Sequence, residues 1–184
     1  FEKYAAYYQS TSNQIYWADI AQFSRYVDHY HEVIDRHMGT PASTEVITEL
    51  YVPRDALSEF MWESRKLLRK LESQVIYGTI RFIARDEESF LAWAKDRYAC
   101  VIFNLHTEHS PSGLEKSKAA LRGLIDLARS AGGSFYLTYH RYATRDQLLD
   151  CYPQFPEFLK QKQKYDPGEL FESDWYRHCK GLTA

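Results

Sequence analysis

The sequence has few of the residues that assign a protein to a class directly. Only three of its 184 residues are cysteines, Cys100, Cys151 and Cys179, and their odd number and wide spacing argue against a disulfide scaffold and a zinc knuckle. Unpaired thiols are typical of a reducing compartment, which predicts a cytoplasmic location. The pair Gly132-Gly133 follows a predicted helix and does not open one, so it predicts a helix end and not a phosphate-binding loop.

Net charge and long apolar runs are lacking as well. The formal net charge is −2, which gives no electrostatic reason to expect nucleic acid or an anionic membrane as a partner. No apolar run approaches the roughly 20 residues needed to span a bilayer, and no signal peptide is visible. Aromatic residues are abundant, with 15 Tyr, 10 Phe and 4 Trp, so many of them must be exposed or line a cleft or a partner surface.

Hydrophobic periodicity predicts alternating helices and strands. Strands are predicted over residues 44–52, 75–84, 98–106 and 134–140. Helices are predicted near 20–37 and 57–71, from Asp86 to Ala94, from Pro111 to Gly132, from Thr144, and again up to Lys164. This order predicts an α+β fold with a mainly antiparallel sheet and helices on one face, of the ferredoxin-like split βαβ type, although parallel α/β packing stays open. Residues 1–18 are expected to be an extended lead-in and residues 19–184 the domain itself.

Three predicted strands each have an apolar face and a face of hydrogen-bonding groups, because strand side chains alternate. The polar faces carry Tyr77, Thr79, Arg81, Asn104, His106, Tyr136, Thr138 and His140. These groups suit a polyhydroxylated ligand, and the two histidines could also move protons. A merely solvated sheet face is the alternative, but it usually carries more Lys, Glu and Ser. The pattern therefore favours a binding site.

A metal site has weaker support. His106 and His109 have a spacing that could hold a metal, but no carboxylate is spaced to complete the ligand set. A metal-dependent hydrolase is therefore the least favoured of the functions considered, and no metal ligand is predicted.

Four stretches resemble a known family. They are TELYVPRD (48–55), YGTIRFIARDEESFLAWA (77–94), VIFNLH (101–106) and the segment 132–175, which contains KYDPGELF. Together they resemble the C-terminal half of FAD-linked oxidases of the vanillyl-alcohol oxidase / p-cresol methylhydroxylase superfamily, close to the sugar, alditol and aldonolactone oxidases. The resemblance implies a cap domain that covers the flavin ring and lines the substrate pocket, while an FAD-binding domain of the same parent protein holds the cofactor.

The resemblance also implies roles for the polar face. His140 or His106 would be the base, and Arg81 would stabilise negative charge on substrate or flavin. Glu49 and Tyr139 match positions near the flavin or its substrate. The substrate would be held by Tyr77, Thr79, Asn104, Tyr136 and Thr138. Related alditol oxidases carry an acidic residue two positions before the arginine, and this chain has Thr79 there.

The sequence thus predicts the substrate-binding cap portion of an FAD-dependent oxidoreductase that oxidises a hydroxyl carbon of a sugar, alditol or lactone. The chain starts at Phe1 without a methionine, which is consistent with a fragment, and alone it is expected to be inactive. The alternative is a free-standing α+β module that binds a ligand or regulates without flavin.

Overall fold

The computed structural model describes residues 6, 9–10, 12–15, 36 and 41–183. Contacts divide the chain into two units, Phe1–Ala42 and Ser43–Ala184. The predicted lead-in over residues 1–18 and the predicted helix over 20–37 lie largely outside the described residues. The second unit contains all of the strands described below.

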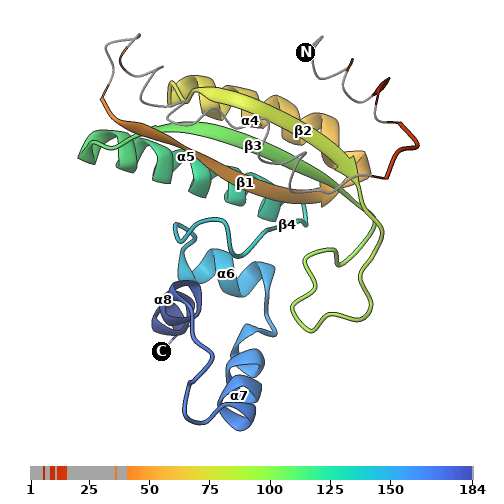
Figure 1. Ribbon diagram of the computed structural model, residues 1–184, viewed down its shortest axis with the longest axis vertical. Coiled ribbons are helices and arrows are strands. Elements are labelled where there is room, and N and C mark those ends of the chain that lie inside the picture. The colour runs from red at the N-terminus through yellow and green to blue at the C-terminus, as the bar shows by residue number, and fades with distance from the viewer. Residues whose placement is uncertain (1–5, 7–8, 11, 16–35, 37–40, 184) are drawn as a thin grey trace. The chain divides into compact units, whose positions relative to one another are not determined.

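Four antiparallel strands form one sheet in the order β2-β3-β1-β4 (Figure 1). The two central strands, β1 (Ser43–Pro53) and β3 (Tyr98–Glu108), pair along their whole length, and β2 (Val75–Phe82) and β4 (Ser134–Phe135) lie at the edges. Helix α4 (Leu57–Lys70), preceded by the 3-10 turn η1 (Arg54–Ala56), connects β1 to β2, and α5 (Pro111–Ser130) connects β3 to β4. This is the ferredoxin-like order, so the predicted α+β class is confirmed and the parallel alternative is wrong.

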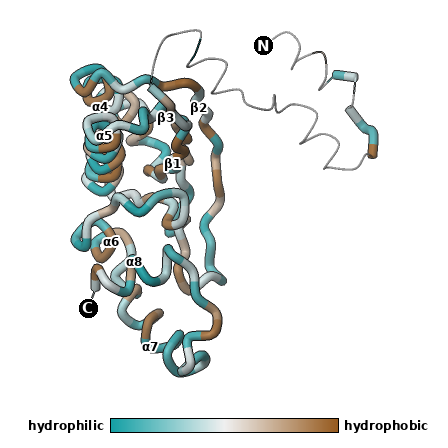
Figure 2. The backbone as a smooth tube through the Cα atoms, turned by 60° about the vertical axis from the view of Figure 1, so that its left-hand side comes forward, coloured by the Kyte–Doolittle hydropathy of each residue, from teal (hydrophilic) through white to brown (hydrophobic). Residues whose placement is uncertain are grey.

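Helices α4 and α5 lie on the same side of the sheet (Figure 2). The alternation of strand residues directs Leu50, Val101 and Leu105 toward α5, where Leu121 and Leu124 are fully buried against them. This side of the sheet holds the main hydrophobic core, and none of the described helices packs against the opposite side.

Three further helices pack against the same core. They are α6 (Arg145–Cys151), α7 (Phe155–Tyr165) and α8 (Asp174–Thr183), and each buries at least one residue there: Leu148, Phe155 and Cys179. Helix α6 begins after Thr144, as predicted, with a capping box in which the Thr144 side chain accepts from Gln147 N and the Gln147 side chain accepts from Thr144 N. Helix α8 is absent from the sequence-based prediction. None of the helices in the described part of the chain is long and apolar enough to cross a membrane.

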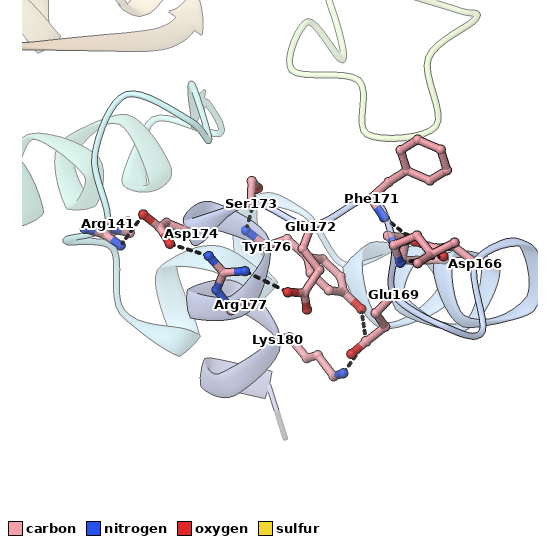
Figure 3. A network of polar contacts seen from close by, with 12 residues as sticks. Arg141, Asp166, Glu169, Phe171, Glu172, Ser173, Asp174, Tyr176, Arg177 and Lys180 are labelled. Atoms are coloured by element: carbon pink, nitrogen blue, oxygen red, sulfur yellow. Dashed lines mark hydrogen bonds and ion pairs between the residues drawn. The ribbon is translucent and has the colours of Figure 1, made fainter.

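The turn between α7 and α8 is held by two carboxylates (Figure 3). Asp166 accepts from the backbone N–H of Leu170 at 2.9 Å and of Phe171 at 3.0 Å, and it pairs with Lys162. Glu169 accepts from the Tyr176 hydroxyl at 2.7 Å. These hydrogen bonds fix the backbone of the turn, although the side chains of Leu170 and Phe171 at its tip are exposed.

Two predicted elements are wrong. The segment from Asp86 to Ala94 is a loop, because the Asp86 carboxylate accepts from the backbone of Glu88 and Ser89 and closes one turn that no helix continues. The strand predicted over 134–140 ends at Phe135, with one more ladder bond from Tyr136 N to Glu49 O at 2.9 Å. The chain then leaves β1 and turns toward the helix side of the sheet.

All three cysteines are buried free thiols, which predicts low reactivity. Burial raises the pKa of Cys100 to about 12 and that of Cys151 and Cys179 to about 11. Because the thiolate is the reactive form, we expect almost no reaction of the native protein with a thiol-specific disulfide reagent at pH 8, and reaction of all three thiols after unfolding in guanidinium. Rapid labelling of even one thiol in the native protein would contradict this arrangement.

Candidate functional site

The side of the sheet opposite α4 and α5 carries the candidate site, and none of the described helices packs on it. We call this side the open face. It is formed by alternate residues of the three long strands: Glu45, Ile47, Glu49 and Tyr51 of β1; Cys100, Ile102, Asn104 and His106 of β3; and Tyr77, Thr79 and Arg81 of β2. The register places Glu49, Ile102 and Thr79 in one row across the sheet, and Tyr51, Cys100 and Arg81 in the next.

A polar cluster lies at the centre of these two rows. The Glu49 carboxylate accepts from the Tyr51 hydroxyl at 2.8 Å, from the Tyr139 hydroxyl at 3.3 Å and from the Cys100 thiol at 3.6 Å. Burial and the charge of Glu49 raise the pKa of Tyr139, and the nearby Arg81 guanidinium acts in the opposite direction. We call Glu49, Tyr51, Arg81, Cys100 and Tyr139 the Glu49 cluster.

Arg81 is the cation of this cluster, and its side chain is exposed. Within the described part of the chain no carboxylate forms an ion pair with it, so its hydrogen-bond donors are available to a ligand. A guanidinium beside a carboxylate and a phenol can bind a polar group and stabilise negative charge that develops on it.

Aromatic rings fix the surroundings of the cluster. The ring of Tyr51 stacks on Trp93 with a centroid distance of 5.4 Å, and the Trp93 carbonyl accepts from the Ser134 hydroxyl at 2.9 Å. The ring of Tyr136 lies 4.7 Å from that of Tyr139. Burial raises the pKa of Tyr51, so its hydroxyl stays protonated and keeps donating to the carboxylate. These contacts hold the 83–97 loop and the chain after β4 against the open face.

A second polar group lies at the far end of the open face. Asn104 donates to Glu45, and the Asn104 Oδ1 atom is buried without a hydrogen-bond partner. His106 is opposite Glu45 in the register and also lines a cavity of about 200 Å³ beside α5. Arg81 lies opposite Cys100, six residues before His106 along β3, which is about 20 Å at the usual strand rise. His106 and Arg81 are therefore too far apart to contact one small substrate together.

His106 and His109, whose spacing could hold a metal, have no third ligand beside them among the described residues. His109 Nε2 lies 3.2 Å from Thr44 Oγ1, and no group of three or more His, Cys, Asp or Glu side chains suited to a metal occurs among the described residues.

The structure brings most of the predicted site residues to the open face or its edge. Those on the strands are Glu49, Tyr77, Thr79, Arg81, Asn104 and His106, while Tyr136, Thr138 and Tyr139 follow β4. Sequence reasoning misses Tyr51, Cys100 and Trp93 as members of the site. For Tyr51 a signal exists, because strand alternation puts it on the same face as Glu49.

The predicted face of His140 is wrong. Its ring is buried, with 8% of the residue exposed, and Nε2 lies 3.3 Å from Thr48 Oγ1, on the helix side of β1. The Tyr142 backbone N–H points to Nδ1 at 3.4 Å. Alternation fails because the strand ends at Phe135 and the following residues turn beneath the sheet. The three groups predicted to be catalytic, His140, Arg81 and His106, therefore do not meet in one place.

The burial of His140 predicts a pH-dependent stability. Burial lowers its pKa to about 4, against about 6.5 in an unfolded chain. Between these values the unfolded state binds more protons, so stability falls as the pH is lowered through this window. We expect His140 to account for a loss of about 2 kcal/mol in the free energy of unfolding between pH 7 and pH 5. Urea titrations at both pH values measure this loss of unfolding free energy. The loss should be smaller in His140→Gln than in the wild type. In His109→Gln, which alters an exposed histidine, it should equal that of the wild type.

Comparison with known proteins identifies the family. The family model for D-arabinono-1,4-lactone oxidase matches residues 4–179, almost the whole chain. The L-gulono-1,4-lactone dehydrogenase of Mycobacterium tuberculosis, from strains CDC 1551 / Oshkosh and ATCC 25618 / H37Rv, is 26% identical over 134 residues. That match covers 72% of this chain but only 30% of the relative's length. The extent of the family match shows that this chain belongs to the D-arabinono-1,4-lactone oxidase family of oxidoreductases.

Proposed function

We propose that this chain is the substrate-binding portion of a longer FAD-dependent oxidoreductase that oxidises a hydroxyl carbon of an aldonolactone or a related sugar. The observation that carries this proposal is the Glu49 cluster, which presents a guanidinium, a phenol and a partly buried carboxylate on a sheet face of a lactone oxidase family member against which none of the described helices packs. The chain alone is expected to be inactive. A cytoplasmic location stays part of the proposal and rests on the three free thiols.

The described residues suit the flavin ring of FAD but not its phosphates. The open face offers Arg81 and the neighbouring rings of Tyr136 and Tyr139 to a flat ring with hydrogen-bond acceptors. The phosphates of a dinucleotide need a different site, usually a glycine-rich turn before a helix, and the described part of the chain provides none. In α5 the N-terminus is capped by the Ser110 hydroxyl, which accepts from Gly113 N. The proposed partner is therefore an FAD-binding domain of the same polypeptide.

The hydroxyl and amide groups near Asn104 on the open face suit a hydroxylated substrate. Tyr77 lies opposite Asn104 in the register, and Thr79 lies two residues further along β2. We assign these three residues to the substrate, together with Tyr136 and the exposed Thr138.

The residues of this chain would bind, orient and stabilise, while bound FAD would supply the oxidising power by accepting a hydride. Arg81 would hold the substrate oxygen and stabilise the negative charge that develops on it. Tyr136 and Tyr139 would cover the reacting carbon and limit access of water. His140 is not assigned to catalysis, because it faces Thr48 behind the sheet, and we assign it to holding the 136–143 segment in place.

The test is a visible absorption spectrum of the protein purified from the complete reading frame, with the 184-residue chain as the control. Flavin bands in the long form and none in the short form, together with oxidation of an aldonolactone by the long form, are the expected results. A reading frame that starts at this segment, or a long form without flavin, would disprove the proposal and favour the free-standing binding module.

A further inference from the structure

The open face contains a candidate for the group that takes the substrate's proton. Oxidation of a hydroxyl carbon releases a proton from the hydroxyl, so an acceptor is needed near Arg81. His140 lies behind the sheet and His106 lies at its far end. Arginine does not act as a base at ordinary pH. Among the described residues the carboxylate of Glu49 remains as an acceptor, and it is linked to the Arg81 side through Tyr139, which donates to Glu49 and whose pKa the Arg81 guanidinium also affects.

The two oxygens of Glu49 differ in their surroundings. Oε2 accepts from the buried Tyr51 hydroxyl at 2.8 Å, which holds the carboxylate in position. Oε1 accepts from the Tyr139 hydroxyl at 3.3 Å, and the Tyr139 side chain is 46% exposed. A phenol oxygen that donates one hydrogen bond can still accept another. Tyr139 therefore connects the solvent side of the open face to Glu49.

We propose that Tyr139 and Glu49 form a proton relay that deprotonates the substrate hydroxyl. The inference rests on the proposed function. The substrate O–H bond breaks and its proton passes to Tyr139 Oη, while the proton of Tyr139 passes to Glu49 Oε1. The electron pair of the C–H bond would leave as hydride, for which bound FAD would supply the acceptor, and the former alcohol would become a carbonyl. The step leaves Tyr139 neutral and Glu49 protonated, and Arg81 stabilises the charge on the substrate oxygen in between.

The environment of Tyr139 fits this role. Burial and Glu49 raise the pKa of the phenol, so it stays protonated between turnovers and can pass a proton on. Glu49 would act through Tyr139, whereas Tyr139 would touch the substrate.

Kinetics of the complete, flavin-loaded protein test the relay with D-arabinono-1,4-lactone and L-gulono-1,4-lactone. We expect Glu49→Gln and Tyr139→Phe each to lower kcat by about 100-fold or more with little change in KM, since proton transfer contributes in that range. The double variant should be no slower than Glu49→Gln, because the two residues act as a unit. Glu63→Gln and Tyr165→Phe, on exposed parts of α4 and α7, are matched controls that should keep wild-type kcat.

Two measurements separate a relay from a structural effect. Acetate should restore activity to Glu49→Ala at least tenfold and should not affect Glu49→Gln, because a small carboxylate can fill only the vacated space. The second measurement needs no cofactor: NMR of the 184-residue chain with ¹³Cζ-tyrosine, in which Tyr139→Phe identifies the Tyr139 signal. Glu49→Gln should move the titration of that signal to lower pH.

The outcomes distinguish this inference from the proposed function. A complete wild-type protein that oxidises an aldonolactone, with kcat retained in Glu49→Gln or a Tyr139 titration unchanged by that substitution, overturns the relay and leaves the proposed function standing. A complete protein that lacks flavin or oxidises neither lactone overturns both.

Discussion

Replacing Arg81 with alanine in the complete protein is expected to lower kcat/KM for an aldonolactone by about 10²–10³-fold. The guanidinium is the one positive charge of the Glu49 cluster, and its loss removes the group that stabilises developing negative charge. Since Arg81 is exposed on the edge strand β2, the substitution leaves no buried group unpaired. The melting temperature and the flavin spectrum should therefore stay near those of the wild type. Steady-state kinetics with both lactones measures the effect.

Two variants serve as controls for this prediction. Arg85→Ala removes an exposed arginine from the neighbouring loop, where its side chain lies 3.6 Å from Glu87, and it should keep wild-type kinetics. Arg81→Lys keeps the charge but loses the planar fork of donors, so part of the activity should return. Equal activity of Arg81→Ala and the wild type would remove Arg81 from the site.

Replacing Gly133 with alanine is expected to lower the free energy of unfolding by about 3 kcal/mol or more. A Cβ atom at Gly133 would lie 1.9 Å from the Tyr51 carbonyl oxygen and 2.9 Å from that of Ala128. Both contacts are to backbone, and Gly133 N also donates to the Ala128 oxygen at 2.8 Å, so the strand and the end of α5 would have to separate. The displacement would reach Tyr51, so substrate oxidation should fall as well. Denaturant titration followed by circular dichroism measures the loss.

Other glycines provide the comparison. Gly132 has φ of +77°, but a Cβ atom added there would meet nothing within 4 Å, so Gly132→Ala should cost only about 1 kcal/mol through backbone strain. Gly181, in α8, also has open space around it, and Gly181→Ala should change stability by less than about 1 kcal/mol in the favourable direction. A Gly133→Ala variant as stable as Gly132→Ala would contradict the close approach of the two backbones.

The sequence predicts the central strands well because apolar and polar residues alternate along part of each strand. In β3 the apolar residues Val101 and Leu105 alternate with Asn104 and His106, and this period of two is enough to identify both faces of the strand. The same argument places Thr79 and Arg81 of β2 on the polar face. Local signals of this kind need no information about distant parts of the chain.

The predictions that fail concern segments whose conformation depends on remote contacts. The residues after Phe135 have the composition of a strand, but β1 offers them only a short pairing, and His140 is buried against Thr48 instead. The apolar residues from Asp86 to Ala94 have the spacing of a helix. The segment is nevertheless a loop, and its Trp93 ring stacks on Tyr51 of β1. Propensity is a weak guide where such contacts decide the outcome.

By itself the sequence determined the fold class, the two faces of the long strands and the family, since each depends on local periodicity or on matching segments. Only the tertiary structure decided which polar residues meet. Strand register brings Glu49 and Tyr51 of β1 beside Cys100, which pairs with Arg81 of β2. The turn after β4 brings Tyr139 to Glu49 and places His140 on the other side of the sheet, against Thr48. Register and chain reversal arise from packing between residues far apart in the sequence, so no local pattern contains them.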